Sequence, residues 1–259
     1  MRIAVKIGSN VLTRPDGTLD FTRMSALVDQ IADLRKAGHE VILISSGAVA
    51  SGRSELQLPI NEQAEMDSVE QRQLFSAVGQ AKLMGRYVDL FRDHGIHVGQ
   101  VLTMKENFAD GPHRQNQQSC MSAMLSHGVL PIVNENDTVA ITELMFTDND
   151  ELSGLIAEMM QCQVLILLSN IDGIYDADPS LPDATIIREV EYGTDLSSYI
   201  QQKKSSAGRG GMRSKYHTAS TMAGQGIHAY IANGKRENIL TDLLWHPERI
   251  PFTHFKACP

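Results

Sequence analysis

The strongest constraint on the fold is a regular alternation between short apolar runs and longer amphipathic stretches. "RIAVKI" at residues 2–7 precedes "FTRMSALVDQIADLRKAG" at 21–38, where apolar residues recur at helical spacing. Gly38 follows this pattern at the position where glycine commonly ends a helix. The next run, "EVILIS" at 40–45, is typical of a strand that is covered on both faces. The first 45 residues therefore predict a strand, a helix and a second strand.

The same alternation continues along the chain. Four further helical stretches are each followed by a predicted strand. Val69 to His94 precedes "IHVGQVLTM", and "HRQNQQSCMSAMLSHG" precedes "VLPIV". "DNDELSGLIAEMMQC" precedes "QVLILLS", "GMRSKYHTASTMAGQG" precedes "IHAYIANG", and the helical stretch "KRENILTDLLW" comes last. This order predicts a mostly parallel sheet with helices on both faces. No linker, repeat or low-complexity tract interrupts the 259 residues, so we expect a single domain over residues 1–259.

Charge and cysteine usage exclude several classes of protein. The net charge of −8 argues against nucleic acid as a partner, because phosphate backbones are bound by clustered Lys and Arg. The three cysteines are widely spaced without a C-x-x-C motif, which fits a reducing compartment and neither a disulfide framework nor a zinc cluster. The N-terminus has no signal-peptide pattern, and no apolar run approaches the ~18 residues that span a bilayer. We expect a cytoplasmic protein with no membrane partner.

Small or polar residues directly follow four of the predicted strands. These segments are Gly8-Ser9-Asn10, Ser45-Ser46-Gly47, Asn134-Glu135-Asn136-Asp137 and Ser169-Asn170. In open α/β sheets, ligands bind beyond the carboxyl ends of the parallel strands. One or two such segments could be solvated loops, but four at one edge predict a binding site.

Lys6 interrupts the first predicted strand and has two interpretations. The strand could lie at an edge of the sheet with one face in solvent. Alternatively, Lys6 points toward an anion at the strand end, where Gly8 lets the backbone approach the ligand closely. "SSGAVASG", after the second strand, favours an anion site because it places small residues at a helix N-terminus. Close packing of that helix on the sheet is the alternative.

Two further stretches combine turn chemistry with charge. "GRGGMRSK" (208–215) is a glycine-rich loop opening a helix with Lys215, but it matches neither the P-loop nor the dinucleotide-binding motif. It is either a plain flexible loop or, with "SNIDGIYDADP" upstream, a nucleotide-contacting region. Asp148, Asn149 and Asp150 begin a helix, where N-capping explains one acid. The nine histidines are scattered and suggest neither a general base nor a metal triad.

Taken in order, these motifs resemble the amino acid kinase family from about residue 3 to about residue 245. The motifs are Lys6-Ile-Gly-Ser, Ser45-Ser46-Gly47-Ala, Asn134-Glu-Asn-Asp137, Asp148-Asn149-Asp150, "DGIYDADP" and "GGMRSK". The resemblance implies an α/β fold, an αβα three-layer sandwich around a mainly parallel eight-stranded sheet. It also implies that residues up to about 150 bind an amino acid and residues from about 151 to 259 bind the nucleotide.

Within the family, the resemblance is to members that transfer the γ-phosphoryl group of ATP to the side-chain carboxylate of L-glutamate. The product is L-glutamyl 5-phosphate, and the reaction is the first step of proline biosynthesis. Lys6 and Lys215 are then the catalytic cations and Asp150 orients them. Mg²⁺ is held mainly by phosphates and water, with no protein metal ligand.

The resemblance also implies the binding residues. The predicted substrate-binding residues are Ser46, Gly47, Asn134, Asp137 and Asn149, with Asp137 holding the α-ammonium and the asparagines the α-carboxylate. The predicted ATP-binding residues are Lys6, Gly8, Ser9, Ser169, Asn170, Gly173, Tyr175, Asp178, Arg209, Gly210, Gly211, Met212 and Lys215. Ser169-Asn170 departs from the threonine and aspartate common in relatives, which weakens the inference for the adenine side.

Alternatives and partners complete the expectations. The alternatives are another family kinase, acting on N-acetylglutamate, aspartate, carbamate or a nucleoside monophosphate, or a non-catalytic amino-acid sensor. The chain ends at Pro259 without the C-terminal PUA (RNA-modification-type) domain of many bacterial relatives, so properties linked to that domain are not carried over. Expected partners are L-glutamate, ATP, proline as a feedback inhibitor, glutamyl 5-phosphate reductase, and further copies of the chain in a homo-oligomer.

Overall fold

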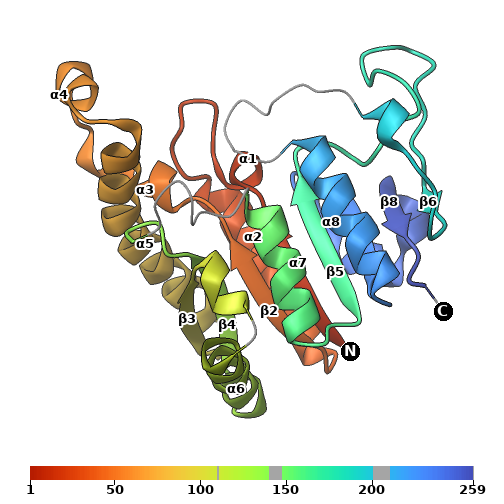
Figure 1. Ribbon diagram of the computed structural model, residues 1–259, viewed down its shortest axis with the longest axis horizontal. Helices are drawn as coiled ribbons and strands as arrows, with labels where there is room; N and C mark the ends of the chain where they lie inside the picture. Colours follow the sequence, from red (N-terminus) through yellow and green to blue (C-terminus); the bar gives the residue numbers. More distant parts are fainter. Residues whose placement is uncertain (110, 140–147, 201–210, 259) are drawn as a thin grey trace.

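The computed structural model describes residues 1–109, 111–139, 148–200 and 211–258. Its framework is one eight-stranded sheet with the strand order β3-β4-β2-β1-β5-β7-β8-β6 (Figure 1). The strands are β1 (Arg2–Ile7), β2 (Glu40–Ser45), β3 (Val98–Thr103), β4 (Leu130–Glu135), β5 (Val164–Ser169), β6 (Glu189–Val190), β7 (His228–Asn233) and β8 (Phe252–Phe255).

The sheet is mainly parallel, as predicted. β7 and β8 are the antiparallel pair, and the other strand pairs run parallel. β4, β2, β1 and β5 are consecutive neighbours in the sheet. Their carboxyl ends therefore lie side by side, which brings the four polar segments of the sequence to one edge.

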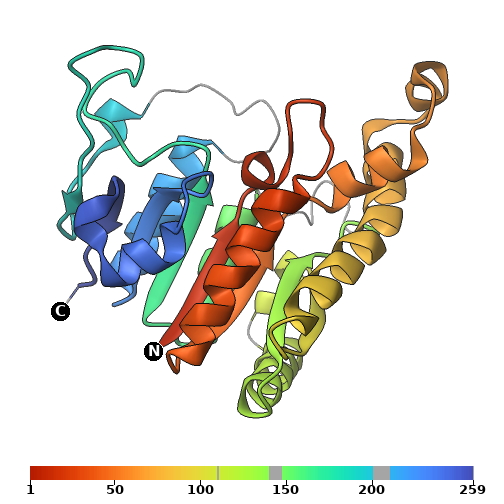
Figure 2. The same ribbon diagram turned by 180° about the vertical axis from the view of Figure 1, so that it is seen from behind.

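Helices cover both faces of the sheet, seen from opposite sides in Figures 1 and 2. Apolar residues of α2, α5 and α9 form one core with the sheet, and those of α7 and α8 form a second core on the other face. The helices are α1 (Ser9–Leu12), α2 (Phe21–Lys36), α3 (Ala48–Leu56), α4 (Ile60–Glu65), α5 (Ser68–Arg92), α6 (Pro112–Ser126), α7 (Asn149–Met159), α8 (Met212–Gly224) and α9 (Ile239–Trp245), with 3-10 turns η1 (Lys105–Phe108), η2 (Ser197–Tyr199) and η3 (Pro247–Arg249). This arrangement confirms the predicted αβα sandwich. Within the described ranges, no helix has both the length and the apolar character needed to cross a membrane.

The edge-strand interpretation of Lys6 is wrong. β1 lies in the middle of the sheet, hydrogen-bonded to β2 on one side and to β5 on the other. Lys6 is only 5% exposed, and the strand residues beside it are buried as well. A lysine in this position needs a buried partner for its charge, because an unpaired ammonium group in the interior is strongly unfavourable.

The periodicity did not indicate β6 or β8, although the resemblance implied an eight-stranded sheet. β6 has two residues and β8 has four, with the sequence "FTHF". Such short segments contain too few residues for an alternation to be recognised. The helix predicted from Val69 to His94 is confirmed as α5, which Asp67 begins with a capping box shared with Glu70.

Close packing of α3 against α5 forms one wall beside the polar edge of the sheet. A Cβ atom on Gly52 would lie 1.8 Å from the carbonyl oxygen of Phe75, and one on Gly79 would lie 1.8 Å from that of Ala48. The two backbones therefore touch, and only glycine fits at either crossing position. The interpretation that "SSGAVASG" allows close packing is thus confirmed for Gly52, although the helix packs closely against α5 and not against the sheet. Ser46 and Gly47 of the same stretch face the cleft described below.

Candidate active site

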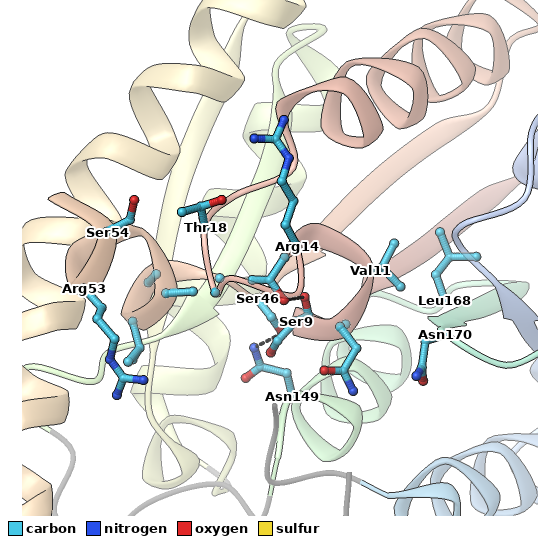
Figure 3. A pocket seen from close by; sticks show the side chains of 18 of the residues that line it. Ser9, Val11, Arg14, Thr18, Ser46, Arg53, Ser54, Asn149, Leu168 and Asn170 are labelled. Carbon is cyan, nitrogen blue, oxygen red and sulfur yellow. Dashed lines mark hydrogen bonds between the residues drawn. The ribbon is translucent and has the colours of Figure 1, made fainter. Parts of the chain in front are cut away.

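A cleft of about 1140 Å³ lies at the carboxyl ends of β1, β2, β4 and β5. Residues from each of the four polar segments line it, including Gly8, Ser46, Asn134 and Ser169. Figure 3 shows Ser46 and Asn149 facing one another within the cleft, with Leu168 and Asn170 farther along it. The four segments therefore form one site, large enough for two ligands of moderate size.

Lys6, Asp150 and Lys215 form a buried ion cluster at this cleft. Lys6 Nζ lies 2.6 Å from Oδ1 of Asp150, and Lys215 Nζ lies 2.8 Å from Oδ2. The three side chains come from β1, α7 and α8, and Asp150 is fully buried while both lysines line the cleft. Two ammonium groups share one carboxylate, so the cluster carries a net positive charge toward the cleft.

The burial of this cluster shifts the pKa of two of its groups. Burial lowers the pKa of Lys6 and the nearby Lys215 lowers it further, while Asp150 acts in the opposite direction. Burial by itself raises the pKa of Asp150, but Lys6 and Lys215 outweigh burial and hold that pKa below its ordinary value. Asp150 is therefore held in its ionised form between the two ammonium groups.

Gly8 brings the backbone close to the Lys6 ammonium group. A Cβ atom built on Gly8 would lie 3.5 Å from Lys6 Nζ and 3.1 Å from the carbonyl oxygen of Leu168. A methyl group here would be in ordinary van der Waals contact with the lysine ammonium group but unusually close to the Leu168 carbonyl oxygen. The predicted role of Gly8, close approach of the backbone to the charged end of the site, agrees with this geometry.

An amide network links three of the predicted substrate-binding residues. Asn149 Nδ2 donates to Ser46 Oγ at 2.9 Å and to Asn134 Oδ1 at 3.2 Å. Asn134 Nδ2 donates to Oε1 of Gln80 on α5 at 2.9 Å. These bonds hold Ser46, Asn134 and Asn149 together at the junction of β2, β4 and α7. They also occupy both N–H groups of Asn149.

Asp137 is paired with Arg72, a residue that sequence reasoning did not identify. Arg72 Nε donates to Asp137 Oδ1 at 2.7 Å, and Arg72 Nη2 also contacts both Asp137 and Glu135. Burial raises the pKa of Asp137, although the Arg72 charge and hydrogen bond act to lower it. Arg72 belongs to α5, and nothing in its sequence surroundings distinguishes it from other charged helix residues. The contact arises only because the fold brings the start of α5 beside the end of β4 and the residues that follow it.

Asp148 is the N-cap of α7, in agreement with the prediction that N-capping explains one acid in this stretch. Its Oδ1 accepts hydrogen bonds from the backbone N–H groups of Asp150 and Glu151 at 2.7 and 3.1 Å. Its Oδ2 is buried and has no hydrogen-bond partner among the described residues. Because Asp148 also lines the cleft, this oxygen is a free acceptor for a bound group.

The predicted nucleotide residues are only partly brought together. Gly8, Ser9, Ser169, Asn170 and Lys215 line the cleft, together with Lys235, which the sequence did not indicate. Gly211 and Met212 begin α8, whose first turn leads to Lys215. Arg209 and Gly210 lie outside the described residues.

Three nucleotide predictions fall in the loop after β5 and not on the cleft lining. Gly173 packs on Thr253, where a Cβ atom would lie 2.6 Å from the hydroxyl oxygen. Tyr175 lies beside Asp172, and Asp178 accepts hydrogen bonds from Ser180 at the next turn. These contacts give each of the three residues a local structural role, and their binding roles stay predictions.

Metal-ligating side chains do not gather in this region. Residues 1–109, 111–139, 148–200 and 211–258 contain no group of three His, Cys, Asp or Glu side chains placed to hold an ion. A divalent cation at this cleft would therefore need most of its ligands from a bound molecule and from water.

Comparison with known proteins agrees with this geometry. Residues 1–233 match the amino acid kinase family. The glutamate 5-kinase of Bacteroides thetaiotaomicron is 66% identical over 254 residues, which cover 98% of this chain and 69% of that protein. Glutamate 5-kinases of Chlorobaculum tepidum and Symbiobacterium thermophilum are 47% and 43% identical, over 92% and 94% of this chain. The chain spans 65% of the length of the first of these two and 92% of the second.

Solved structures add the fold. An isopentenyl phosphate kinase superimposes with a TM-score of 0.69 at 15% identity, covering 99% of this chain and 100% of its own. The UMP kinase from Ureaplasma parvum gives a TM-score of 0.65 at 17% identity, covering 99% and 98%. At such low identity these two structures support the architecture alone. The family match over residues 1–233 and the 66% identity to the Bacteroides thetaiotaomicron protein show that the chain belongs to the amino acid kinase family.

Proposed function

We propose that this chain transfers the γ-phosphoryl group of ATP to the side-chain carboxylate of L-glutamate. The product is L-glutamyl 5-phosphate, and the reaction is the first step of proline biosynthesis. The observation that carries the proposal is the buried cluster in which Asp150 holds Lys6 and Lys215 at 2.6 and 2.8 Å. The relatives named glutamate 5-kinase support glutamate as the acceptor.

The chemistry requires positive charge rather than a base. A glutamate side chain has an ordinary pKa of about 4.3, so the nucleophile is already ionised at neutral pH. One of its oxygens bonds to the γ-phosphorus while the bond from that phosphorus to the β,γ-bridging oxygen breaks, and ADP leaves with the electron pair. Repulsion between the anionic reactants is the main obstacle, which Lys6 and Lys215 reduce from within the cleft.

The two ends of the cleft suit two different ligands. Ser46, Asn134, Asp137 and Asn149 offer polar groups for an amino acid, with the N–H groups at the start of α3 after Gly47. Ser169 and Asn170 lie at the other end, where we place ATP. The division of the chain at about residue 150 into amino-acid-binding and nucleotide-binding parts is a proposal that follows from this placement.

Magnesium would accompany ATP and neutralise charge on its phosphates. Phosphate oxygens and water are its expected ligands, because the described residues bring no three suitable side chains together. Oδ2 of Asp148, buried without a hydrogen-bond partner in the same part of the chain, can accept a hydrogen bond from one of the waters.

Further partners are proposed from the same resemblance. Proline carries an ammonium group and a carboxylate that could use the anchors of glutamate, so we propose feedback inhibition that glutamate relieves competitively. Glutamyl 5-phosphate reductase is the proposed recipient of the product. A cytoplasmic homo-oligomer is the proposed state of the protein. Proline inhibition that saturating glutamate does not relieve would instead indicate a separate regulatory site.

The test is an acyl-phosphate assay with the purified chain. ATP, Mg²⁺ and hydroxylamine are incubated with L-glutamate, N-acetyl-L-glutamate, L-aspartate and bicarbonate with ammonia, and the hydroxamate and ADP are measured. We expect hydroxamate from L-glutamate well above that from the other compounds. Turnover of another acceptor in preference to glutamate would replace the substrate assignment. Tight glutamate binding without ADP release would support a sensor instead of a kinase.

A further inference from the structure

Arg53 is a cation on the wall of the cleft to which the proposed mechanism gives no role. It lies on α3, one turn beyond the N-terminal residues that follow Gly47, and it lines the cleft next to Ser54. Its guanidinium carbon lies 5.3 Å from the centre of the Phe75 ring. Among the residues that the structure describes, no acceptor hydrogen-bonds to this guanidinium group and no carboxylate pairs with it.

The side-chain N–H donors of Arg72 and Asn149, at the amino-acid end of the cleft, are already engaged. Arg72 is bonded to Asp137 and Glu135, and both N–H groups of Asn149 are taken by Ser46 and Asn134. A carboxylate that leaves water for this end of the cleft needs new donors, because its desolvation is otherwise uncompensated. Besides the backbone N–H groups at the start of α3, Arg53 offers side-chain donors that no other described group uses.

The charges at this end match an amino acid. Glu135 and Asp137 place two buried carboxylates beside Arg72, and Asp137 lines the cleft, where an ammonium group can approach it. Arg53 then supplies one unpaired positive charge for an α-carboxylate. The two ionic groups of a zwitterion thus find opposite charges on two different elements, β4 with α5 for the ammonium and α3 for the carboxylate.

We propose that Arg53 binds the α-carboxylate of the amino acid substrate and thereby determines specificity for an α-amino acid. In the view of Figure 3 the Arg53 side chain extends downward from α3, so that its guanidinium group lies at about the same height as Asn149, whereas the Arg14 side chain extends upward. The guanidinium fork can donate two parallel hydrogen bonds to a carboxylate. This inference rests on the proposed kinase function.

The packing of α3 fixes the position of Arg53 before a ligand binds. Gly52 brings the α3 backbone against Phe75 of α5, and the Phe75 ring, which is fully buried, supports the guanidinium group. A side chain held in this way loses less conformational entropy on binding than a free surface arginine. Arg53 therefore combines an open hydrogen-bonding face with a fixed support.

The experiment compares substrates that differ by the α-carboxylate. The kcat/KM of the wild type and of Arg53→Ala is measured with L-glutamate and with 4-aminobutanoate, which keeps the ammonium and the reacting carboxylate. An inhibition constant against glutamate replaces kcat/KM for a compound that is not turned over. We expect Arg53→Ala to lose roughly 10- to 100-fold with glutamate, through KM, and almost nothing with 4-aminobutanoate. Arg53→Lys should recover part of the loss, because it keeps the charge without the fork.

Arg86→Ala is the matched control. Arg86 is also exposed, and its guanidinium carbon lies 4.8 Å from the Phe21 ring, but it is not part of the cleft lining. The Arg86→Ala substitution removes an arginine–phenylalanine contact of the same kind, so we expect wild-type kinetics with L-glutamate and with 4-aminobutanoate. Melting temperatures of Arg53→Ala and Arg86→Ala separate lost binding from lost folding.

Two results would overturn the inference while leaving the proposed function intact. Equal losses with glutamate and 4-aminobutanoate, or a raised KM for ATP, would assign Arg53 to the phosphate side. Unchanged glutamate kinetics in Arg53→Ala would remove its role altogether. If the wild type itself forms no hydroxamate from glutamate, the proposed function fails, and the inference fails with it.

Discussion

Arg72 donates a hydrogen bond from Nε to Oδ1 of Asp137 at 2.7 Å, across the interface between α5 and the end of β4. The same guanidinium group reaches Glu135 at 2.8 Å. Both carboxylates are almost fully buried, whereas the Arg72 side chain is 20% exposed. The arginine thus offsets part of the cost of burying two acids at the end of the cleft where we place the substrate ammonium.

Asp137→Asn should damage glutamate use far more than the use of glutarate. The substitution keeps the shape of the side chain but removes the charge that faces the substrate ammonium. Leaving a desolvated cation unpaired costs about 2–5 kcal/mol, and glutarate has no ammonium to lose its partner. The measurement is kcat/KM for both compounds in the wild type and the variant.

The melting temperature serves as the control for Asp137→Asn. The variant also weakens the contact with Arg72, so a moderate loss of stability is expected on structural grounds alone. A structural role without substrate contact would reduce activity with glutamate and glutarate by the same factor. Equal losses, accompanied by a lowered melting temperature, would therefore contradict the ammonium assignment.

Lys215→Ala should reduce kcat by roughly 10²-fold or more while leaving the KM for glutamate nearly unchanged. The reason is that Lys215 acts on charge in the transferring phosphoryl group rather than on the amino acid. Steady-state kinetics with varied glutamate at saturating ATP provide the measurement. Lys36→Ala, which removes an exposed ion pair with Asp33, is the control and should keep wild-type kinetics. A raised KM with an unchanged kcat would move Lys215 to a role in binding.

Much of the sheet could be predicted from the sequence, because its central strands are buried on both faces and therefore consist of continuous apolar runs. β4 and β5 are buried at every position, and such runs have few other interpretations. The cluster of polar segments at the carboxyl edge followed from the parallel arrangement. Asp150 and the two lysines were placed by the resemblance, and the 2.6 and 2.8 Å contacts agree with that placement.

The pairings across elements could not be predicted in this way. Arg72 and Asp137 are 65 residues apart, and their contact depends on the angle at which α5 crosses the sheet edge. The position of Arg53 beside Phe75 depends on Gly52, which lets the α3 backbone contact α5. Local patterns report which face of an element is buried, but they carry no information on which side chains meet across an interface.

Asp150→Asn should destabilise the protein by about 3–5 kcal/mol at pH 7, because it leaves two buried ammonium groups without their shared carboxylate. Lys6 and Lys215 hold the pKa of Asp150 below its ordinary value of 3.8, against the effect of burial. A depressed carboxyl pKa contributes stability above the ordinary value and loses it as the pH falls through the folded-state pKa. The stability difference between wild type and variant should therefore be constant near neutrality and shrink below pH 3.8.

Urea unfolding of both proteins between pH 7 and pH 3 measures this difference. Burial raises the pKa of Asp137, so this group, taken by itself, stabilises the folded protein at low pH. This contribution is lost as the pH rises. Because Asp137 is present in both proteins, its effect cancels in the comparison. A stability difference that stays constant down to the lowest pH would show that the charge of Asp150 does not stabilise the cluster.

Gly52→Ala should lower the free energy of unfolding by 1–3 kcal/mol or more, as is typical of overpacking. The new methyl group would lie 1.8 Å from the carbonyl oxygen of Phe75, a backbone atom that cannot move away without shifting α5. Gly85→Ala on α5 is the matched control, because nothing lies within 4 Å of its Cβ position and alanine favours a helix interior by up to about 1 kcal/mol. Chemical denaturation of both variants gives the two free energies. If α3 and α5 are packed backbone to backbone, the two substitutions must have opposite signs; a neutral Gly52→Ala would show that α3 can move, and the fixed position of Arg53 would then no longer follow.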